Sequence, residues 1–104
     1  MNMLKQIQKK VKSQQYELSK HAVDQSIIRQ ITISELEDTL IAKAEIIEDY
    51  PEDKYGSSCL ILGFTNISRP LHVLCSYPSR PLLKIITVYE PDSNMWINFR
   101  TRRK

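Results

Sequence analysis

Two apolar segments of strand-like composition, residues 70–77 and 82–89, constrain the fold of this chain most. The link between them, residues 78–81, has proline at both ends and is typical of a turn. Two earlier segments of the same kind, residues 44–50 and 58–65, are also bounded by turn-rich links. Because short links join antiparallel strands, the sequence predicts a four-stranded antiparallel meander.

The N-terminal part of the chain carries helical patterns instead. A basic segment within residues 1–15 has apolar side chains at helical spacing, namely Leu4, Ile7 and Val11. Ser19 offers an N-cap for a second helix that ends near residue 30. The expected apolar ridge of that helix consists of Val23, Ile27 and Ile31.

A third helix is predicted from a capping box formed by Ser34 and Glu37, and it runs to about residue 43. Residues 16–18 read as a short extended piece. Together these patterns predict an α+β protein, with N-terminal helices packed on the four-stranded antiparallel meander.

Strict alternation in the last two strands predicts which side chains share a face. In the first of them, one face carries Leu71, Val73 and Cys75, and the other carries His72, Leu74 and Ser76. In the second, one face carries Leu83, Ile85, Thr87 and Tyr89.

The length of 104 residues is enough for one hydrophobic core. We expect a basic helix over residues 1–15, a single domain over residues 16–99 and a basic tail over residues 100–104. No apolar run has the length of a membrane span or of a signal peptide, so a cytoplasmic protein without membrane contact is expected. Cys59 and Cys75 read as buried, reduced side chains, and no cysteine–histidine cluster predicts a metal site.

Charge is segregated along the chain. Residues 1–20 and 57–104 carry an excess of basic side chains, whereas residues 21–56 carry an excess of acidic ones. This pattern predicts a face that binds polyanions or an acidic partner, and an unevenly charged solvated surface is the alternative. The acidic run of residues 45–53 reads as solvated surface.

Two groups of residues resemble the signatures of one family. The first group comprises His21 and Ala22 at a helix start, Arg29, and the run Ile-Thr-Ile-Ser at residues 31–34. The second comprises Arg-Pro-Leu-His-Val at residues 69–73, Thr-Val-Tyr-Glu-Pro-Asp at residues 87–92, and Trp96. Over about residues 16–96 the chain resembles the family catalogued as domain of unknown function 4258.

The resemblance implies a compact fold similar to the RelE-like ribonuclease toxins of bacterial toxin–antitoxin pairs. It also implies an antitoxin-like protein partner, often a zinc-binding one, encoded beside it. The chain departs from the family at Gln25 and Ser26, where an arginine and then a methionine are often found. If that arginine binds phosphate, this chain lacks one such contact.

Metal-independent RNA cleavage needs a base for the 2′-hydroxyl proton, an acid for the 5′-oxygen and cations for the phosphate. Histidine suits the first two roles because its ordinary pKa lies near neutral pH. We expect His72 to be the main catalytic residue, opening onto a hollow that solvent reaches, with His21 as its partner and Tyr89 as a hydrogen-bond donor. The candidate RNA-binding residues are Arg29, Arg80, Arg100 and Trp96. No cofactor and no metal are expected.

Each of these assignments has an alternative. His72 and His21 also suit structural roles, Tyr89 and Trp96 suit core positions, and Arg29 suits an ion pair with an acidic neighbour. The chain as a whole then reads as a non-catalytic module that binds protein or RNA. The helix pair between residues 19 and 43 superficially resembles a DNA-binding helix-turn-helix. Its second helix is acidic and would repel phosphates, which disfavours DNA recognition.

Overall fold

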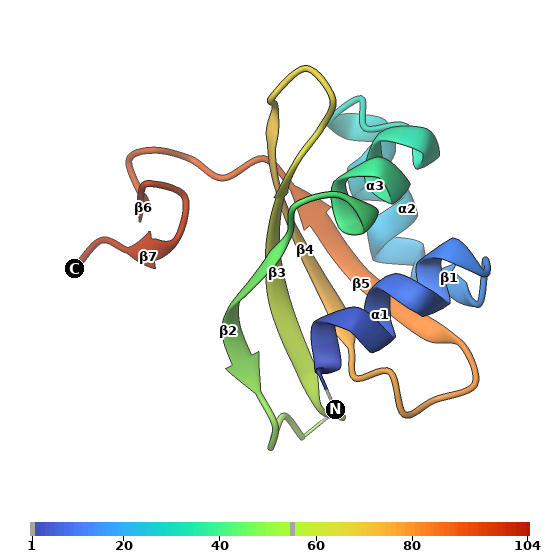
Figure 1. Ribbon diagram of the computed structural model, residues 1–104. Helices are drawn as coiled ribbons and strands as arrows, with labels where there is room; N and C mark the ends of the chain where they lie inside the picture. Colours follow the sequence, from blue (N-terminus) through green and yellow to red (C-terminus); the bar gives the residue numbers. More distant parts are fainter. Residues whose placement is uncertain (1, 55) are drawn as a thin grey trace.

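The computed structural model describes residues 2–54 and 56–104. In that part of the chain, five strands form one sheet in the order β1-β5-β4-β3-β2. The strands are β1 Tyr16–Leu18, β2 Glu45–Tyr50, β3 Ser58–Phe64, β4 Pro70–Ser76 and β5 Leu83–Tyr89. The helices are α1 Met3–Lys12, α2 Lys20–Ile28 and α3 Ile33–Ile41. A hairpin of β6 Trp96–Ile97 and β7 Thr101–Arg102 lies on the side of the sheet opposite the helices (Figure 1).

The expected four-stranded antiparallel meander is wrong, because β1 adds a fifth strand and pairs with β5 in parallel. Tyr16 is the register partner of Leu83 and Leu18 that of Ile85. The other neighbouring strands, β2 to β5, pair antiparallel as predicted. A three-residue segment is too short to show a periodic pattern, and its partner lies far along the chain, so its pairing has no local signal.

The main hydrophobic core lies between the sheet and helices α1 and α3. Ile7 of α1 and Leu40 of α3 are buried against Ile61, Val73 and Ile85 of the sheet. The N-terminal helix is therefore an integral part of the domain. It begins at its N-cap Asn2, whose side chain accepts a hydrogen bond from the backbone of Leu4.

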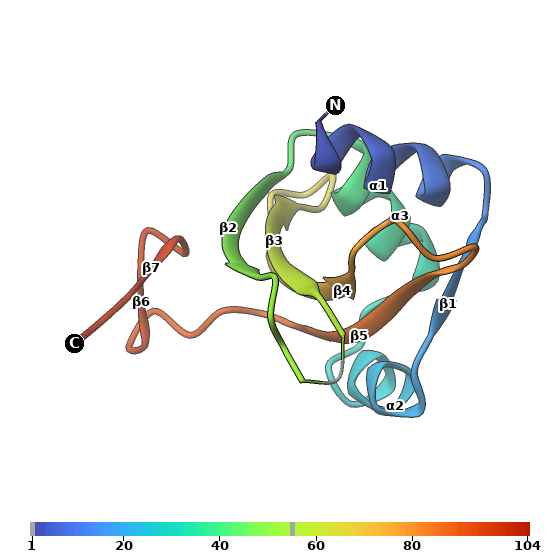
Figure 2. The same cartoon turned by 90° about the horizontal axis from the view of Figure 1, so that it is seen from below.

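Helix α2 runs beside the outer edge of β5, beyond the end of the short β1 (Figure 2). Its N-cap Ser19 donates a hydrogen bond to the carbonyl of Ile86, 2.8 Å away. The expected apolar ridge is wrong for Val23 and Ile27, which are 42% and 70% exposed, whereas Ala22 and Ser26 are buried. Small side chains let the helix approach the strand closely, and this contact outweighs the apolar pattern.

Helix α3 begins two residues earlier in the chain than its predicted cap implied. The capping box is formed by Thr32 and Glu35, not by Ser34 and Glu37. Thr32 accepts from the backbone of Glu35 at 3.0 Å, and the Glu35 carboxylate accepts from the backbone of Thr32 at 3.0 Å. Both pairs have the spacing of a capping box, so the sequence pattern alone does not distinguish them.

Strand β4 alternates as predicted, with Leu71, Val73 and Cys75 in the main core. Strand β5 does not, because its register with β4 shifts between Leu74 and Cys75. The shift puts Val88 in the core with Leu83 and Ile85, and it places Tyr89 opposite His72. The expected shared face of Leu83, Ile85, Thr87 and Tyr89 is therefore wrong.

A close approach of α3 to β3 occurs at Gly63. A Cβ atom on this residue would lie 2.5 Å from Cγ2 of Thr39 and 2.6 Å from its backbone oxygen. Thr39 is fully buried, and its hydroxyl has no hydrogen-bond partner among the described residues. The absence of a side chain at Gly63 is what lets the helix lie this near the strand.

None of the helices in the described part of the chain has the length and apolar character required to cross a membrane.

Candidate functional site

The sheet face opposite α1 and α3 carries His72, the residue predicted to be the main catalytic one. His72 and Ser76 of β4 lie on this face, with Leu60 and Leu62 of β3 beside them. The β6–β7 hairpin covers the part of this face around His72, and the part around Ser76 is open. The two parts therefore differ in what solvent and ligands can reach.

His72 is fully buried beneath the hairpin. Its Nε2 lies 2.6 Å from the backbone oxygen of Phe99, and its Nδ1 lies 3.1 Å from the hydroxyl of Tyr89. A carbonyl only accepts hydrogen bonds, so Nε2 carries the proton and Nδ1 accepts from Tyr89. The ring also meets Trp96 edge to face, with centroids 4.5 Å apart. The expectation that this imidazole opens onto a solvent-reachable hollow is therefore wrong, because the described hairpin occupies that position.

Two arginines of the hairpin attach it to the edge strand β2. Arg100 donates to the carboxylate of Glu45 at 2.5 Å, and Arg102 donates to both carboxylate oxygens of Glu48 at 2.8 and 3.1 Å. The Arg102 guanidinium also lies 4.7 Å from the ring centroid of Trp96. Arg100, predicted to bind RNA, is thus engaged within the protein, and β7 occupies part of the expected basic tail.

Burial lowers the pKa of His72 below its ordinary value, because a charged imidazolium loses its hydration there. The hydrogen bond to Phe99 and the carboxylate of Glu48 oppose this shift, and Arg102 reinforces it. At Glu48 itself burial raises the pKa, but the hydrogen bonds from Arg102 and Tyr50 outweigh burial and hold it below the ordinary value. His72 is therefore neutral and Glu48 ionised near pH 7.

This burial predicts a pH-dependent stability. The pKa of His72 is lower in the folded than in the unfolded chain, so the unfolded chain takes up the proton first as pH falls below about 6.5. The free energy of unfolding should therefore be highest above that pH and decrease between pH 7.5 and 5.5. Urea unfolding at both pH values measures it.

Replacing His72 by glutamine supplies the control, since an amide can also donate to Phe99 and accept from Tyr89 but does not titrate. His72→Gln should lose most of the pH dependence, and His21→Gln should keep it. An unchanged pH dependence in His72→Gln would contradict the assignment.

The remaining predicted residues lie apart from His72. His21 is exposed in the first turn of α2, and no described contact joins it to His72. Arg29 follows α2 and donates to the side chain of Gln25 at 2.9 Å. Tyr89 and Trp96 are thus the predicted residues that the structure brings to His72.

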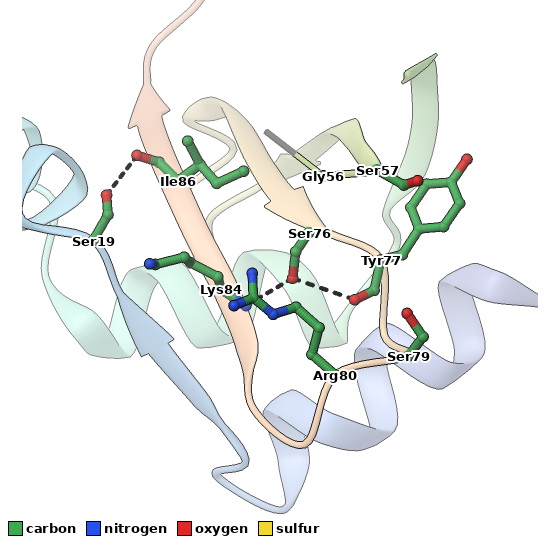
Figure 3. A pocket seen from close by; sticks show the side chains of 9 residues that line it. All are labelled: Ser19, Gly56, Ser57, Ser76, Tyr77, Ser79, Arg80, Lys84 and Ile86. Carbon is green, nitrogen blue, oxygen red and sulfur yellow. Dashed lines mark hydrogen bonds between the residues drawn. The ribbon is translucent and has the colours of Figure 1, made fainter. Parts of the chain in front are cut away.

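Arg80 lies in the open part of the face. There a recess of about 680 Å³ extends over β4, β5 and the link between them (Figure 3). It is lined by Ser19, Gly56, Ser57, Ser76, Tyr77, Ser79, Arg80, Lys84 and Ile86. No carboxylate is among these described lining residues, and neither Arg80 nor Lys84 forms an ion pair with a residue that the structure describes. Glu17 is the register partner of Lys84 but does not come within ion-pair distance.

Helix α1, which packs on the other face of the sheet, also brings lysines to the β4–β5 link. Lys10 donates to the backbone oxygen of Pro81 at 3.1 Å, so α1 lies against the β4–β5 link that carries Arg80. A second hollow, of about 330 Å³, is lined by Gln6, Lys9, Lys10, Gln15 and Pro78. We call Lys9, Lys10, Arg80 and Lys84 the basic tract.

Sequence reasoning missed Lys84 as a residue that lines the recess and Lys10 as a contact of the β4–β5 link. The signal for Lys84 was its place as a lone cation within an otherwise apolar strand segment. The signal for Lys10 was the basic character of the first helix, but the contact of that helix with the β4–β5 link joins residues far apart in the chain.

The fold and this surface define a small α+β domain whose sheet carries a positively charged recess. The chain belongs to the family described as domain of unknown function (DUF4258), whose model matches residues 18–90. The expected family membership is thus confirmed, and β6 and β7 lie beyond the matched residues. Searches of the curated proteins and of the solved structures returned no match. The comparisons accordingly provide no support for a RelE-like relationship.

Proposed function

We propose that this protein binds single-stranded RNA through the basic tract. The observation that carries the proposal is a recess holding Arg80 and Lys84 without a carboxylate partner, next to the lysines of α1. Phosphate groups bind such cations with release of their counterions, which gives sequence-independent affinity. A cation that already had a carboxylate partner would contribute less binding free energy to a phosphate, because it would have to give up that partner.

The shape of the recess favours a single strand. Tyr77 lines it on the side of Ser57 (Figure 3), and its hydroxyl donates to Asp49 at 2.5 Å, which holds the side chain in place. A positively charged groove with an aromatic side chain is typical of sites for single-stranded nucleic acids, because bases stack on the ring while cations follow the backbone. The choice of RNA follows the fold similar to RelE-like ribonuclease toxins that the family resemblance implies, a link that no comparison supports.

The proposal is tested by the salt dependence of binding. Fluorescence anisotropy with a labelled single-stranded RNA should show affinity that falls as salt rises. The double variant Arg80→Gln/Lys84→Gln should bind about tenfold or more weakly, and its slope of log affinity against log salt should shrink by about 1.4, since each phosphate contact on a single strand contributes about 0.7.

The matched control is Arg103→Gln/Lys43→Gln, which removes the same charges from exposed positions that do not line the recess. This variant should bind RNA like the original protein. Equal affinities and slopes for all three proteins would contradict the proposal, and single-stranded DNA of the same sequence reports whether the sugar matters.

A second candidate function is that of a toxin with an antitoxin-like partner, acting by metal-independent RNA cleavage. The observation in its favour is the hydrogen-bonded pair of His72 and Tyr89 with the Arg102 guanidinium in the same cluster. In such a reaction the 2′-oxygen loses its proton to a base and attacks phosphorus, and the 5′-oxygen leaves with a proton from an acid. Because His72 is buried, cleavage requires the β6–β7 hairpin to move.

The partner-free protein, incubated with RNA in a chelator, tests cleavage. Trp96→Ala should loosen the hairpin and increase cleavage, and adding His72→Gln should abolish the increase. Intact RNA after incubation with both the original protein and Trp96→Ala would end the catalytic proposal while leaving RNA binding unaffected.

A further inference from the structure

We infer that the recess around Arg80 and Lys84 holds a terminal phosphomonoester of an RNA strand. The inference rests on the proposed RNA binding and specifies which part of the RNA enters the site. It is carried by the charge of the recess and by the hydrogen-bond donors that are free in it.

The charge of the recess matches a phosphomonoester. Such a group carries about −1.5 to −2 at pH 7 on three terminal oxygens, whereas an internal phosphodiester carries one charge. Arg80 presents a planar fork that suits two oxygens, and Lys84 presents a point charge for a third. With no carboxylate among the described lining residues, both positive charges remain for the ligand.

A free hydroxyl lies beside these cations. Ser19, Ser57 and Ser76 already donate to backbone oxygens of Ile86, Pro51 and Tyr77. Ser79 lines the same recess and forms no hydrogen bond with another described residue. The Ser79 hydroxyl is therefore available to donate to a phosphate oxygen. Because Ser79 precedes Arg80, the hydroxyl and the guanidinium both come from the β4–β5 link.

The recess is bounded by two strands and two links. Ser76, Lys84 and Ile86 lie on β4 and β5, and the links carrying Gly56–Ser57 and Tyr77–Arg80 stand at its sides (Figure 3). Ser19, the N-cap of α2, lies at another side. Elements that are far apart in the chain thus bound one recess.

The experiment compares RNA oligonucleotides of one sequence that end in a 5′-phosphate, in a 3′-phosphate or in hydroxyls at both ends. In competition anisotropy at constant salt, a phosphorylated end should bind at least tenfold more tightly than hydroxyl ends. Arg80→Gln and Lys84→Gln should each remove this preference, and Arg80→Lys should retain part of it. Arg103→Gln and Lys43→Gln, at exposed positions outside the recess, should leave it intact.

Nucleoside 5′-monophosphate, titrated while NMR follows the backbone amides, probes the recess without the rest of the RNA. It should shift the amides of Ser79, Arg80 and Lys84. Equal binding of all three RNAs, with binding still weakened in Arg80→Gln/Lys84→Gln, would overturn the inference and leave the proposed RNA binding standing. Absence of binding by any of the RNAs would overturn both.

Discussion

Replacing Gly63 by alanine should lower the free energy of unfolding by about 3 kcal/mol, at the upper end of what overpacking of a protein core commonly costs. The new Cβ would lie 2.5 Å from Cγ2 of Thr39 and 2.6 Å from its backbone oxygen, both closer than real Cβ contacts come. The backbone oxygen cannot rotate away, so α3 must shift from β3. Urea denaturation followed by circular dichroism measures the loss.

Two variants separate the causes of this loss. Gly56→Ala makes the same change at φ 113°, where nothing lies within 4 Å of the added atom, so backbone strain alone should cost about 1–2 kcal/mol. Gly63→Ala/Thr39→Ser removes the contact with Cγ2 but keeps the contact with the backbone oxygen, so it should recover only part of the loss. A Gly63→Ala protein as stable as the original would show that α3 and β3 are farther apart than described.

Replacing Trp96 by alanine should cost about 3–5 kcal/mol, the usual effect of removing a buried large aromatic side chain. Trp96 meets the His72 ring in an edge-to-face contact, and the Arg102 guanidinium lies over the Trp96 ring. Loss of Trp96 therefore removes two contacts that hold the hairpin in place. With the hairpin loosened, water reaches His72 and its pKa should rise toward the ordinary value of about 6.5. Thermal unfolding and an NMR titration of the imidazole measure the two effects.

Met95→Ala is the matched control, because Met95 precedes Trp96 but is 59% exposed. It should change neither stability nor the titration of His72 appreciably. A Trp96→Ala protein in which the His72 titration stays unchanged would show that the imidazole is shielded by something other than the hairpin.

The larger strands were predictable because each combines an apolar run with turn residues at both ends. Strands β2 to β5 lie within one residue of their predicted bounds at either end. The register shift at Leu74 was not predictable, since strict alternation contains no signal for a bulge. The burial of Ala22 and Ser26 in place of Val23 and Ile27 depends on how near α2 lies to β5, which is a property of the assembled fold.

The candidate site was predictable in part for a similar reason. His72 and Tyr89 occupy neighbouring strands in register, so their contact follows from the antiparallel pairing of β4 and β5. The burial of His72 instead depends on the β6–β7 hairpin. Arg100 of this hairpin binds Glu45 of β2, and these two residues are far apart in the chain. The open recess, likewise, depends on which side chains lack partners, and a sequence does not show this.

The pairing of β1 with β5 has a consequence for the order in which the protein is assembled. A ribosome releases the N-terminal end first, so Tyr16–Leu18 emerge well before Leu83–Ile85, the residues that complete their ladder. Until then Ile7 and Val11 of the first helix have only part of their apolar surroundings and remain in contact with water. We therefore expect a nascent chain that stalls before residue 83 to bind holdase chaperones, and we expect release of β5 to end this dependence.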